Sequence, residues 1–140
     1  MTRNRASAKK AGSSAERRVA DWLAVRLDDD RIDRRVKTGA KDCGDVGGVR
    51  TVAGGRVVVE VKDVARMDLS GWVREAEVER GNDDALLGVV VHKKRGTTDP
   101  AEWYVTMTCE AFAVLLEGGV QSGPVVTPVA ESPTRIGVDR

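Results

Sequence analysis

The spacing of apolar residues predicts a helix near the start of the chain and several strands after it. Apolar side chains recur at helical spacing from Val19 to Leu27, with polar residues between them. Ser13 and Glu16 have the spacing of a capping box, in which the Ser side chain caps the first turn and the Glu reaches back to it. We therefore expect a helix that begins at Ser13 or Ser14 and ends near Leu27, with its apolar stripe facing a core.

A valine-rich run follows a glycine turn and predicts a hairpin. Residues 56–62 read Arg-Val-Val-Val-Glu-Val-Lys, which has the length and composition of a buried strand. Residues 46–52 form a second expected strand that two glycines weaken, and residues 53–55 are a tight turn between the two. In a hairpin centred on Gly54, Asp45 is expected opposite roughly Asp63, to within a residue or two or a bulge at Gly47-Gly48.

The rest of the chain continues the alternation of helices and strands. Residues 86–92, Leu-Leu-Gly-Val-Val-Val-His, form an unbroken apolar strand that we expect near the centre of a sheet. The other expected elements are a short strand or extended basic segment at 34–37, a helix at 70–80 ended by Gly81, a strand at 103–107 and a helix from the cap Thr108 to Leu116. The order α-β-β-β-α-β-β-α predicts an α/β fold with a mixed five-stranded sheet flanked by helices.

Length and charge limit the class of protein further. A chain of 140 residues is expected to form one domain, here residues 13–118, between a flexible basic arm at 1–12 and a flexible tail at 119–140. The net charge of +1 does not by itself indicate a nucleic-acid partner, so the distribution of charges must decide. Two cysteines, Cys43 and Cys109, form no disulfide framework, and no segment has the length of a signal peptide or membrane span. We therefore expect an intracellular protein.

An acid and a base interrupt the valine run. In a strand, Glu60 and Lys62 point to one face, while Val57, Val59 and Val61 point to the other. Burying a carboxylate and an ammonium is costly unless they pair or hold a metal ion. A further acid, Asp45, precedes the partner strand, so the hairpin can gather two carboxylates and a lysine beside Mg²⁺. The alternative is a plain cross-strand salt bridge on an exposed sheet face.

Glu16 has two possible roles as well. As part of the capping box it would only stabilise the helix start. It also shares a helical face with Val19 and Leu23, however, so it can point inward as a fourth functional acid. A zinc site is excluded because His92 is the sole histidine and no cysteine set accompanies it.

Basic residues gather in groups that flank the acids in sequence. Each group alone would be read as ordinary solvated surface. Together they suit the phosphate backbone of a nucleic acid. The expected DNA contacts are Arg34, Arg35, Lys37, Lys41, Lys93, Lys94 and Arg95.

The candidate residues resemble a known motif. Glu16 on the first helix, Gly44-Asp45 before one strand and Glu60-Val61-Lys62 on the next resemble the PD-(D/E)xK nuclease superfamily, and within it the small Holliday junction resolvases of the archaeal and phage type. The resemblance covers residues 13–116 in the order of motifs and elements. The motif is short, and the proline that usually precedes the first Asp is replaced by Gly44.

The resemblance implies a restriction-endonuclease-like sheet and a set of roles. Asp45, Glu60 and the backbone carbonyl of Val61 would bind Mg²⁺, or Mn²⁺, and Glu16 would complete the metal site. Lys62 would orient and help activate the attacking water, leaving a 5′-phosphate and a 3′-hydroxyl. We expect the protein in the cytoplasm, which for a phage-encoded protein is the cytoplasm of the bacterial host.

Three functions remain open at this point. The first is a homodimeric nuclease that cuts four-way junctions with two symmetric nicks, through an interface on either the last helix, around Phe112, or the outer face of the second. The second is a nuclease of the same superfamily that acts on duplex, flap or free-end DNA. The third is a nucleic-acid-binding module that has the fold without catalysis.

Overall fold

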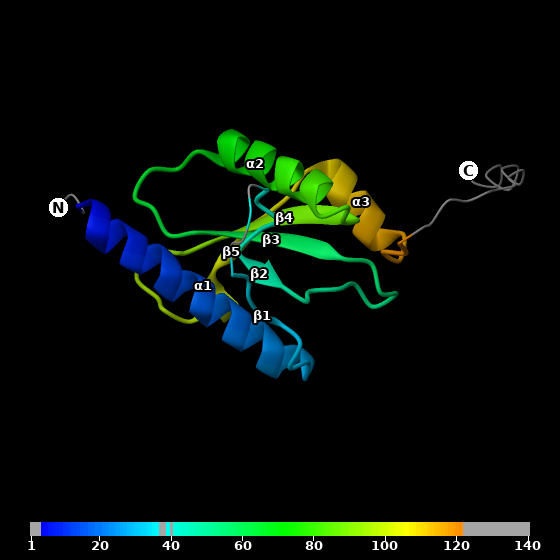
Figure 1. Ribbon diagram of the computed structural model, residues 1–140, viewed down its shortest axis with the longest axis horizontal. Helices are drawn as coiled ribbons and strands as arrows, with labels where there is room; N and C mark the ends of the chain where they lie inside the picture. Colours follow the sequence, from blue (N-terminus) through cyan, green and yellow to red (C-terminus); the bar gives the residue numbers. More distant parts are fainter. Residues whose placement is uncertain (1–3, 37–38, 40, 122–140) are drawn as a thin grey trace, which may run out of the picture.

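A mixed five-stranded sheet carries helices on both faces in the computed structural model, which describes residues 4–36, 39 and 41–121 (Figure 1). The elements are α1 (Arg5–Leu27), β1 (Asp33–Arg34), β2 (Val46–Gly47), β3 (Val57–Lys62), α2 (Leu69–Asn82), β4 (Leu87–His92), the 3₁₀ helix η1 (Pro100–Glu102), β5 (Tyr104–Thr106) and α3 (Cys109–Leu116). The expected α/β class and the expected order of helices and strands are confirmed.

The sheet has the strand order β1-β2-β3-β4-β5. Its central pair, β3 and β4, is parallel, and the three other pairs are antiparallel. A parallel pair needs a crossover connection, which α2 supplies. Because helices cover both faces of this pair, both strands are rich in valine and nearly free of exposed positions.

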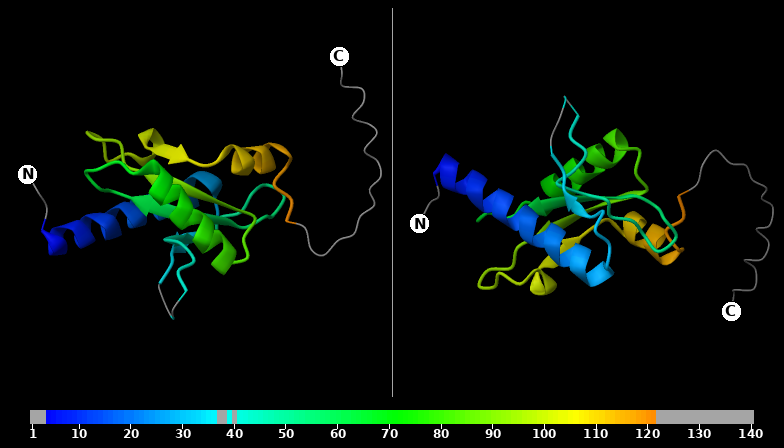
Figure 2. Two further views of the ribbon diagram at one scale, coloured as in Figure 1. Left: turned by 90° about the horizontal axis from the view of Figure 1, so that it is seen from above. Right: turned by 60° about the horizontal axis from the view of Figure 1, so that its bottom comes forward.

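Side chains alternate between the two faces of the sheet along β3, so its residues contact two different helical layers. Val59 and Val61 are buried against α1, where Val19 and Ala20 lie in the same apolar cluster. Helix α2 lies on the opposite face of the sheet (Figure 2). The predicted separation of the valines from Glu60 is therefore confirmed, and Glu60 belongs to the α2 side.

The expected start of the first helix is wrong. Helix α1 begins at Arg5, with the Asn4 side chain accepting a hydrogen bond from the Ser7 N–H at 2.9 Å, so Ser13 lies in mid-helix and forms no capping box. Residues 5–12, expected in the flexible arm, are helical because their alanines and lysines favour helix. This half of α1 is largely exposed and projects past the sheet (Figures 1 and 2). Leu27, expected inward, is 52% exposed.

The expected hairpin register is also wrong. Val46 pairs with Val59, which places Asp45 opposite Glu60 instead of Asp63. A bulge around Gly48 shifts the register and reduces the partner strand to two residues. Gly48 has a φ of +83°, and a Cβ there would collide with the Arg31 carbonyl, so only glycine fits.

The beginning of the expected C-terminal tail packs on the hairpin. The Thr51 hydroxyl donates to the Gly119 carbonyl at 2.5 Å, and the Gln121 side-chain oxygen accepts from the Arg56 N–H at 3.0 Å. The remainder of the expected tail, 122–140, and residues 1–3 of the expected arm lie outside the described residues. None of the helices in the described part of the chain combines the length and apolar character needed to cross a membrane.

Candidate active site

The carboxyl end of β3 brings Asp45, Glu60 and Lys62 together. Asp45 and Glu60 are only 3% and 5% exposed. The Lys62 Nζ lies 3.2 Å from Glu60 Oε2, and Asp45 Oδ2 accepts a hydrogen bond from the Val61 N–H at 2.8 Å. The pair Glu60 and Lys62 is therefore not a salt bridge on an exposed sheet face.

The backbone of Val61 faces the side chain of Asp45. Its N–H and carbonyl share the edge of β3 toward β2, since both groups of a strand residue point the same way. Strand β2 begins only at Val46, so the side chain of Asp45 replaces the ladder partner of the Val61 N–H. The carbonyl expected to bind the metal ion thus lies on the Asp45 side of β3.

Glu16 reaches this group from α1. Its Oε1 accepts from Arg34 Nη2 at 2.9 Å and from Nε at 3.2 Å, and its carboxyl also hydrogen-bonds with Asp45. Burial raises the pKa of Glu16, and the nearby charge of Asp45 adds to this effect, while Arg34 opposes it. Of its two possible roles, the inward orientation is found and the capping role is wrong.

A fourth acid in the cluster is Glu79, whose role, like those of Glu75 and Glu77, the sequence left unresolved. It is 2% exposed on α2, and its carboxyl hydrogen-bonds with that of Glu60. With Asp42 the two form a trio whose oxygens lie within 4.8 Å of one another. The available signal was helical spacing, because Glu79 continues the inward stripe of Trp72 and Ala76.

The two buried carboxyls on facing elements perturb each other. Burial raises the pKa of Glu79 to about 10, and the Glu60 carboxyl contributes in the same direction. Burial also raises the pKa of Glu60 to about 7, against the opposing effects of the Glu79 hydrogen bond and the Lys62 charge. Without a cation, the pair therefore retains a proton at neutral pH.

Lys62 is fixed by a second acid from α2. Its Nζ lies 2.8 Å from Glu75 Oε1, in addition to the contact with Glu60. Burial alone would lower the pKa of Lys62, but these two acids raise it above its ordinary value. Glu75 therefore faces the site as Glu79 does, whereas Glu77 pairs with Arg80 on the exposed side of the helix.

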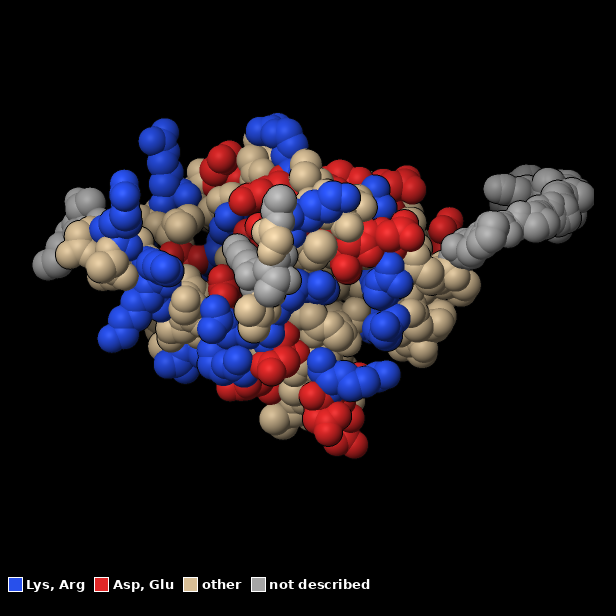
Figure 3. Space-filling view, viewed as in Figure 1, with Lys and Arg blue, Asp and Glu red and all other residues tan. Residues whose placement is uncertain are grey.

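The expected DNA contacts divide into two sets. Arg34 is paired with Glu16, and Arg35 Nη2 lies 3.5 Å from Asp83 Oδ2, so both are engaged within the protein. Lys41, Lys94 and Arg95 are exposed and Lys93 is half-buried, while Lys37 lies outside the described residues. Basic side chains also gather over the N-terminal half of α1 (Figure 3).

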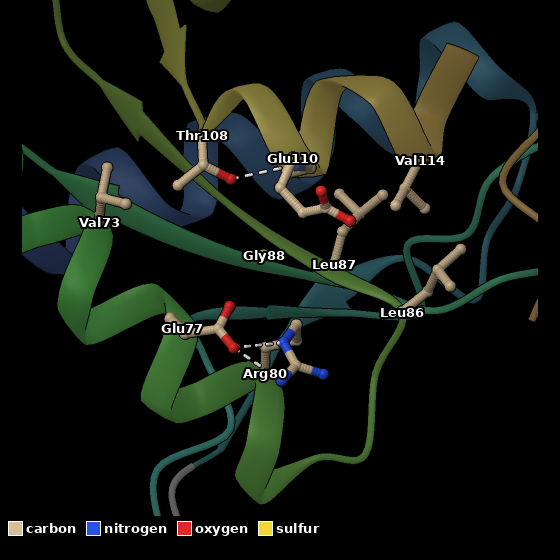
Figure 4. A pocket seen from close by; sticks show the side chains of 10 residues that line it. Val73, Glu77, Arg80, Leu86, Leu87, Gly88, Thr108, Glu110 and Val114 are labelled. Carbon is tan, nitrogen blue, oxygen red and sulfur yellow. Dashed lines mark hydrogen bonds and ion pairs between the residues drawn. The ribbon is translucent and has the colours of Figure 1, made fainter. Parts of the chain in front are cut away.

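Of two hollows in the described part of the chain, one lies away from the acids and the other adjoins them. One, of about 260 Å³, lies between α2 and α3 beside Leu86, Leu87 and Gly88 at the start of β4 (Figure 4). It is therefore at the opposite end of the sheet from the carboxyl end of β3. The other, of about 370 Å³, is lined by Asp42 and Glu79 among others and adjoins the acids.

The donor set suits a hard divalent cation. Carboxylate and carbonyl oxygens are the ligands that Mg²⁺ and Mn²⁺ take, and Oε1 of both Glu60 and Glu79 is buried without a hydrogen-bond partner among the described residues. His92, in contrast, is bonded to Thr106 at 2.8 Å and lies beside Trp72 in the core. Comparisons of the chain with protein-family models, curated proteins and solved structures found no match.

Proposed function

We propose that this protein is a Mg²⁺-dependent endodeoxyribonuclease of the PD-(D/E)xK type that hydrolyses phosphodiester bonds in four-way DNA junctions. The observation that carries the proposal is the burial of Asp45 and Glu60 beside Lys62 at the carboxyl end of β3. Burying three charged groups in one place is costly for stability, and such clusters are typical of functional sites.

The acids are suited to hold the cation on which this chemistry depends. Asp45, Glu60 and the Val61 carbonyl would bind it, with Glu16 hydrogen-bonded to Asp45 as a further ligand or an orienting group. The bound cation supplies charge neutralisation at the phosphate and lowers the pKa of a water molecule. Mn²⁺ is the alternative ion because it prefers the same oxygen donors.

Lys62 is suited to assist the attack. Its contacts with Glu60 and Glu75 fix the ammonium and keep it charged. A fixed ammonium orients a water molecule toward the phosphorus and stabilises the negative charge that develops on the phosphate oxygens. The water adds to phosphorus, the P–O bond to the 3′ oxygen breaks, and the products are a 5′-phosphate and a 3′-hydroxyl.

Positive charge near the site supports a DNA substrate. Residues 93–95, Lys-Lys-Arg, follow directly after β4, whose carboxyl end lies beside that of β3 in the parallel pair. The N-terminal half of α1 projects at the same end of the sheet in both figures of the fold (Figures 1 and 2). These segments, far apart in sequence, can flank a phosphate backbone that enters the site.

An exposed apolar surface supports a homodimer, which two symmetric cuts require. Tyr104 and Val105 on β5 are 51% and 53% exposed, and Phe112 and Leu116 on α3 are 50% and 70% exposed. Strand β5 is also the edge of the sheet. Exposed apolar side chains on an edge strand and on the helix after it are typical of a surface that another chain covers.

The test is cleavage of a labelled synthetic four-way junction in Mg²⁺, beside linear duplex, a flap and single-stranded DNA, with Glu60→Gln as the control variant. Paired symmetric nicks on the junction, absent in the variant, are expected. Cleavage of the other substrates instead, still lost in Glu60→Gln, would replace the junction with another DNA. Absence of any cleavage that depends on Glu60 would overturn the nuclease and leave the binding module.

A further inference from the structure

Glu79 is the most deeply buried charged residue described in this chain, and the proposed catalytic roles do not use it. It lies on α2, on the helix face that also carries Trp72 and Ala76. Only 2% of the residue is exposed, and its carboxyl faces Glu60 across the interface between helix and sheet. A carboxyl placed among apolar side chains destabilises a fold unless it has partners.

We propose that Glu79 and Asp42 form, together with Glu60, a binding site for a divalent oxygen-seeking cation, Mg²⁺ or Mn²⁺. One oxygen from each of the three lies within 4.8 Å of the other two. This inference deepens the proposed function, on which it rests only through the shared Glu60. It adds a ligand from α2 and one from the loop before β2 to a site built otherwise on β3.

The unpaired oxygens provide the second reason. Oε1 of Glu60 and Oε1 of Glu79 are buried, and neither has a hydrogen-bond partner among the described residues. Leaving such an atom unpaired destabilises the fold, because the desolvation of the atom is not compensated. A cation bound between the two carboxyls would coordinate both of these oxygens.

The loop that carries Asp42 is attached to α2 near Glu79. The Asn82 side-chain amide donates to the Asp42 carbonyl at 2.9 Å, and Asp42 Oδ1 accepts from the Gly44 N–H at 3.0 Å. Asp42 therefore approaches the two glutamates from a loop position fixed at both ends. The half-buried carboxylate lies at the side of the trio that faces solvent.

A hollow next to the trio has room for the water molecules that Mg²⁺ retains. It measures about 370 Å³, and Asp42, Glu75 and Glu79 are among its lining residues. Mg²⁺ dehydrates reluctantly and is usually bound by one or two carboxylates with several waters. An entry path for a hydrated ion thus reaches the acids from the α2 side.

Two substitutions distinguish whether Glu79 and Asp42 act as cation ligands or only as structural hydrogen-bonding groups. Glu79→Gln keeps the shape and the hydrogen-bonding capacity of a neutral glutamic acid but removes the anionic oxygen. Asp42→Asn retains the oxygen that accepts from Gly44. Glu77→Gln is the matched control, because Glu77 lies on the exposed face of the same helix and pairs with Arg80.

The experiment is titration of the full, metal-free chain with Mn²⁺, followed by electron paramagnetic resonance, with circular dichroism of each variant to verify folding. We expect Glu79→Gln and Asp42→Asn to weaken Mn²⁺ binding at least about tenfold, as loss of a metal-site contact does, and Glu77→Gln to bind as the wild type does. Wild-type Mn²⁺ affinity in folded Glu79→Gln and in Asp42→Asn would overturn the inference. If Glu60→Gln still loses Mn²⁺ in that case, the proposed function stands; if it does not, both fall.

Discussion

The carboxylate of Asp45 accepts a hydrogen bond from the backbone N–H of Val61 at 2.8 Å. This contact replaces a rung of the sheet ladder just beyond the two residues of β2. One oxygen of Asp45 is thereby fixed to β3, one residue from Glu60. A ligand held in this way is preorganised and loses little side-chain entropy when it binds an ion.

Asp45→Asn separates this structural contact from the charge. The asparagine side-chain oxygen can still accept from Val61, so we expect the variant to fold and to bind DNA. Loss of the negative charge at the cation should lower junction cleavage by at least about 10²-fold. Single-turnover cleavage and DNA-binding titrations in parallel measure the two properties, and wild-type cleavage by Asp45→Asn would contradict the assignment.

Lys62→Met should abolish cleavage without abolishing cation binding. Methionine retains much of the length of the lysine stem but lacks the ammonium that contacts Glu60 and Glu75. We expect the cleavage rate to fall about 10²- to 10³-fold, as for loss of one electrostatic contact in the transition state, while Mn²⁺ still binds.

Arg74→Ala is the control for Lys62→Met, since it removes an exposed positive charge from the hollow that Asp42 and Glu79 line. It should affect cleavage far less. Equal loss of cleavage in Lys62→Met and Arg74→Ala would show that only the local net charge matters.

The metal-free protein should become less stable as pH rises above about 5. The pKa of Glu60 is raised to about 7 and that of Glu79 to about 10, so the folded chain retains protons that the unfolded chain releases above the ordinary glutamate value of 4.5. Stability then falls with pH, by up to about 1.4 kcal/mol per pH unit for each proton of difference. The fall continues through pH 7 and extends toward pH 10.

Urea denaturation in a chelator from pH 5 to 9 measures this slope, and Glu79→Gln provides the comparison. The glutamine of this variant has no proton to release, so the variant should gain stability relative to the wild type as pH rises. Parallel pH profiles for the two proteins would contradict the raised pKa of Glu79. The half-buried Asp29, whose pKa is lowered to about 2 by its hydrogen bonds with Arg31, affects stability only at more acidic pH.

Periodicity along the chain predicted which elements form and which face of β3 is apolar. The valine run and Thr108, which caps α3 through a hydrogen bond to the Ala111 N–H at 3.0 Å, carry strong local signals. The helix start was misplaced because Ser13 and Glu16 match a capping box, while the Asn4 cap that the structure uses has a weaker pattern. The register was misplaced because the two glycines at 47 and 48 indicate where a bulge can form but not by how many residues it shifts the pairing.

The buried pair of Glu60 and Lys62 was accessible from sequence, and its partners on α2 were not. Glu60 and Lys62 stand out because charged residues interrupt an apolar strand. Glu75 and Glu79 occur in a helix of alternating charge, where most acids are solvated, and only their contacts with β3 distinguish them from Glu77. A buried acid that continues an apolar helical stripe is the signal to look for in such a helix.

The projecting half of α1 should contribute to DNA affinity. Lys9 and Lys10 are exposed on this half, and their replacement by alanine retains helix propensity. For each phosphate contact that is lost, the slope of log affinity against log salt should flatten by about 0.9. Arg26→Ala, in the last turn of the same helix, removes an exposed charge at the other end and should leave the slope unchanged.

A triple substitution in the loop after β4 is tested by the same measure, the slope of log DNA affinity against log salt. Neutralising Lys93, Lys94 and Arg95 should flatten the slope by up to about 0.9 per residue. Fluorescence anisotropy of a labelled junction in a chelator, between low and physiological salt, gives the slopes without cleavage. An unchanged slope in both the Lys9/Lys10 variant and the triple variant would exclude this end of the molecule as the DNA surface.

The β5–α3 surface, defined by Tyr104, Val105, Phe112 and Leu116, should hold two copies together. Phe112→Asp places a charge on this exposed apolar surface, and a buried unpaired charge opposes association. We expect sedimentation velocity to show a dimer for the wild type and a monomer for Phe112→Asp. The monomer should make single nicks in junctions. Each subunit retains Asp45, Glu60 and Lys62 at the carboxyl end of β3, away from α3.

Val52→Asp is the matched control for the dimer. Val52 is fully exposed at the tip of the hairpin, so a charge there should change neither the fold nor the association. A monomeric wild type, or a Phe112→Asp variant that remains dimeric, would exclude the β5–α3 surface as the interface. The outer face of α2 would then be the next candidate, since Val78 is 60% exposed there, and Val78→Asp would distinguish it by the same sedimentation measurement.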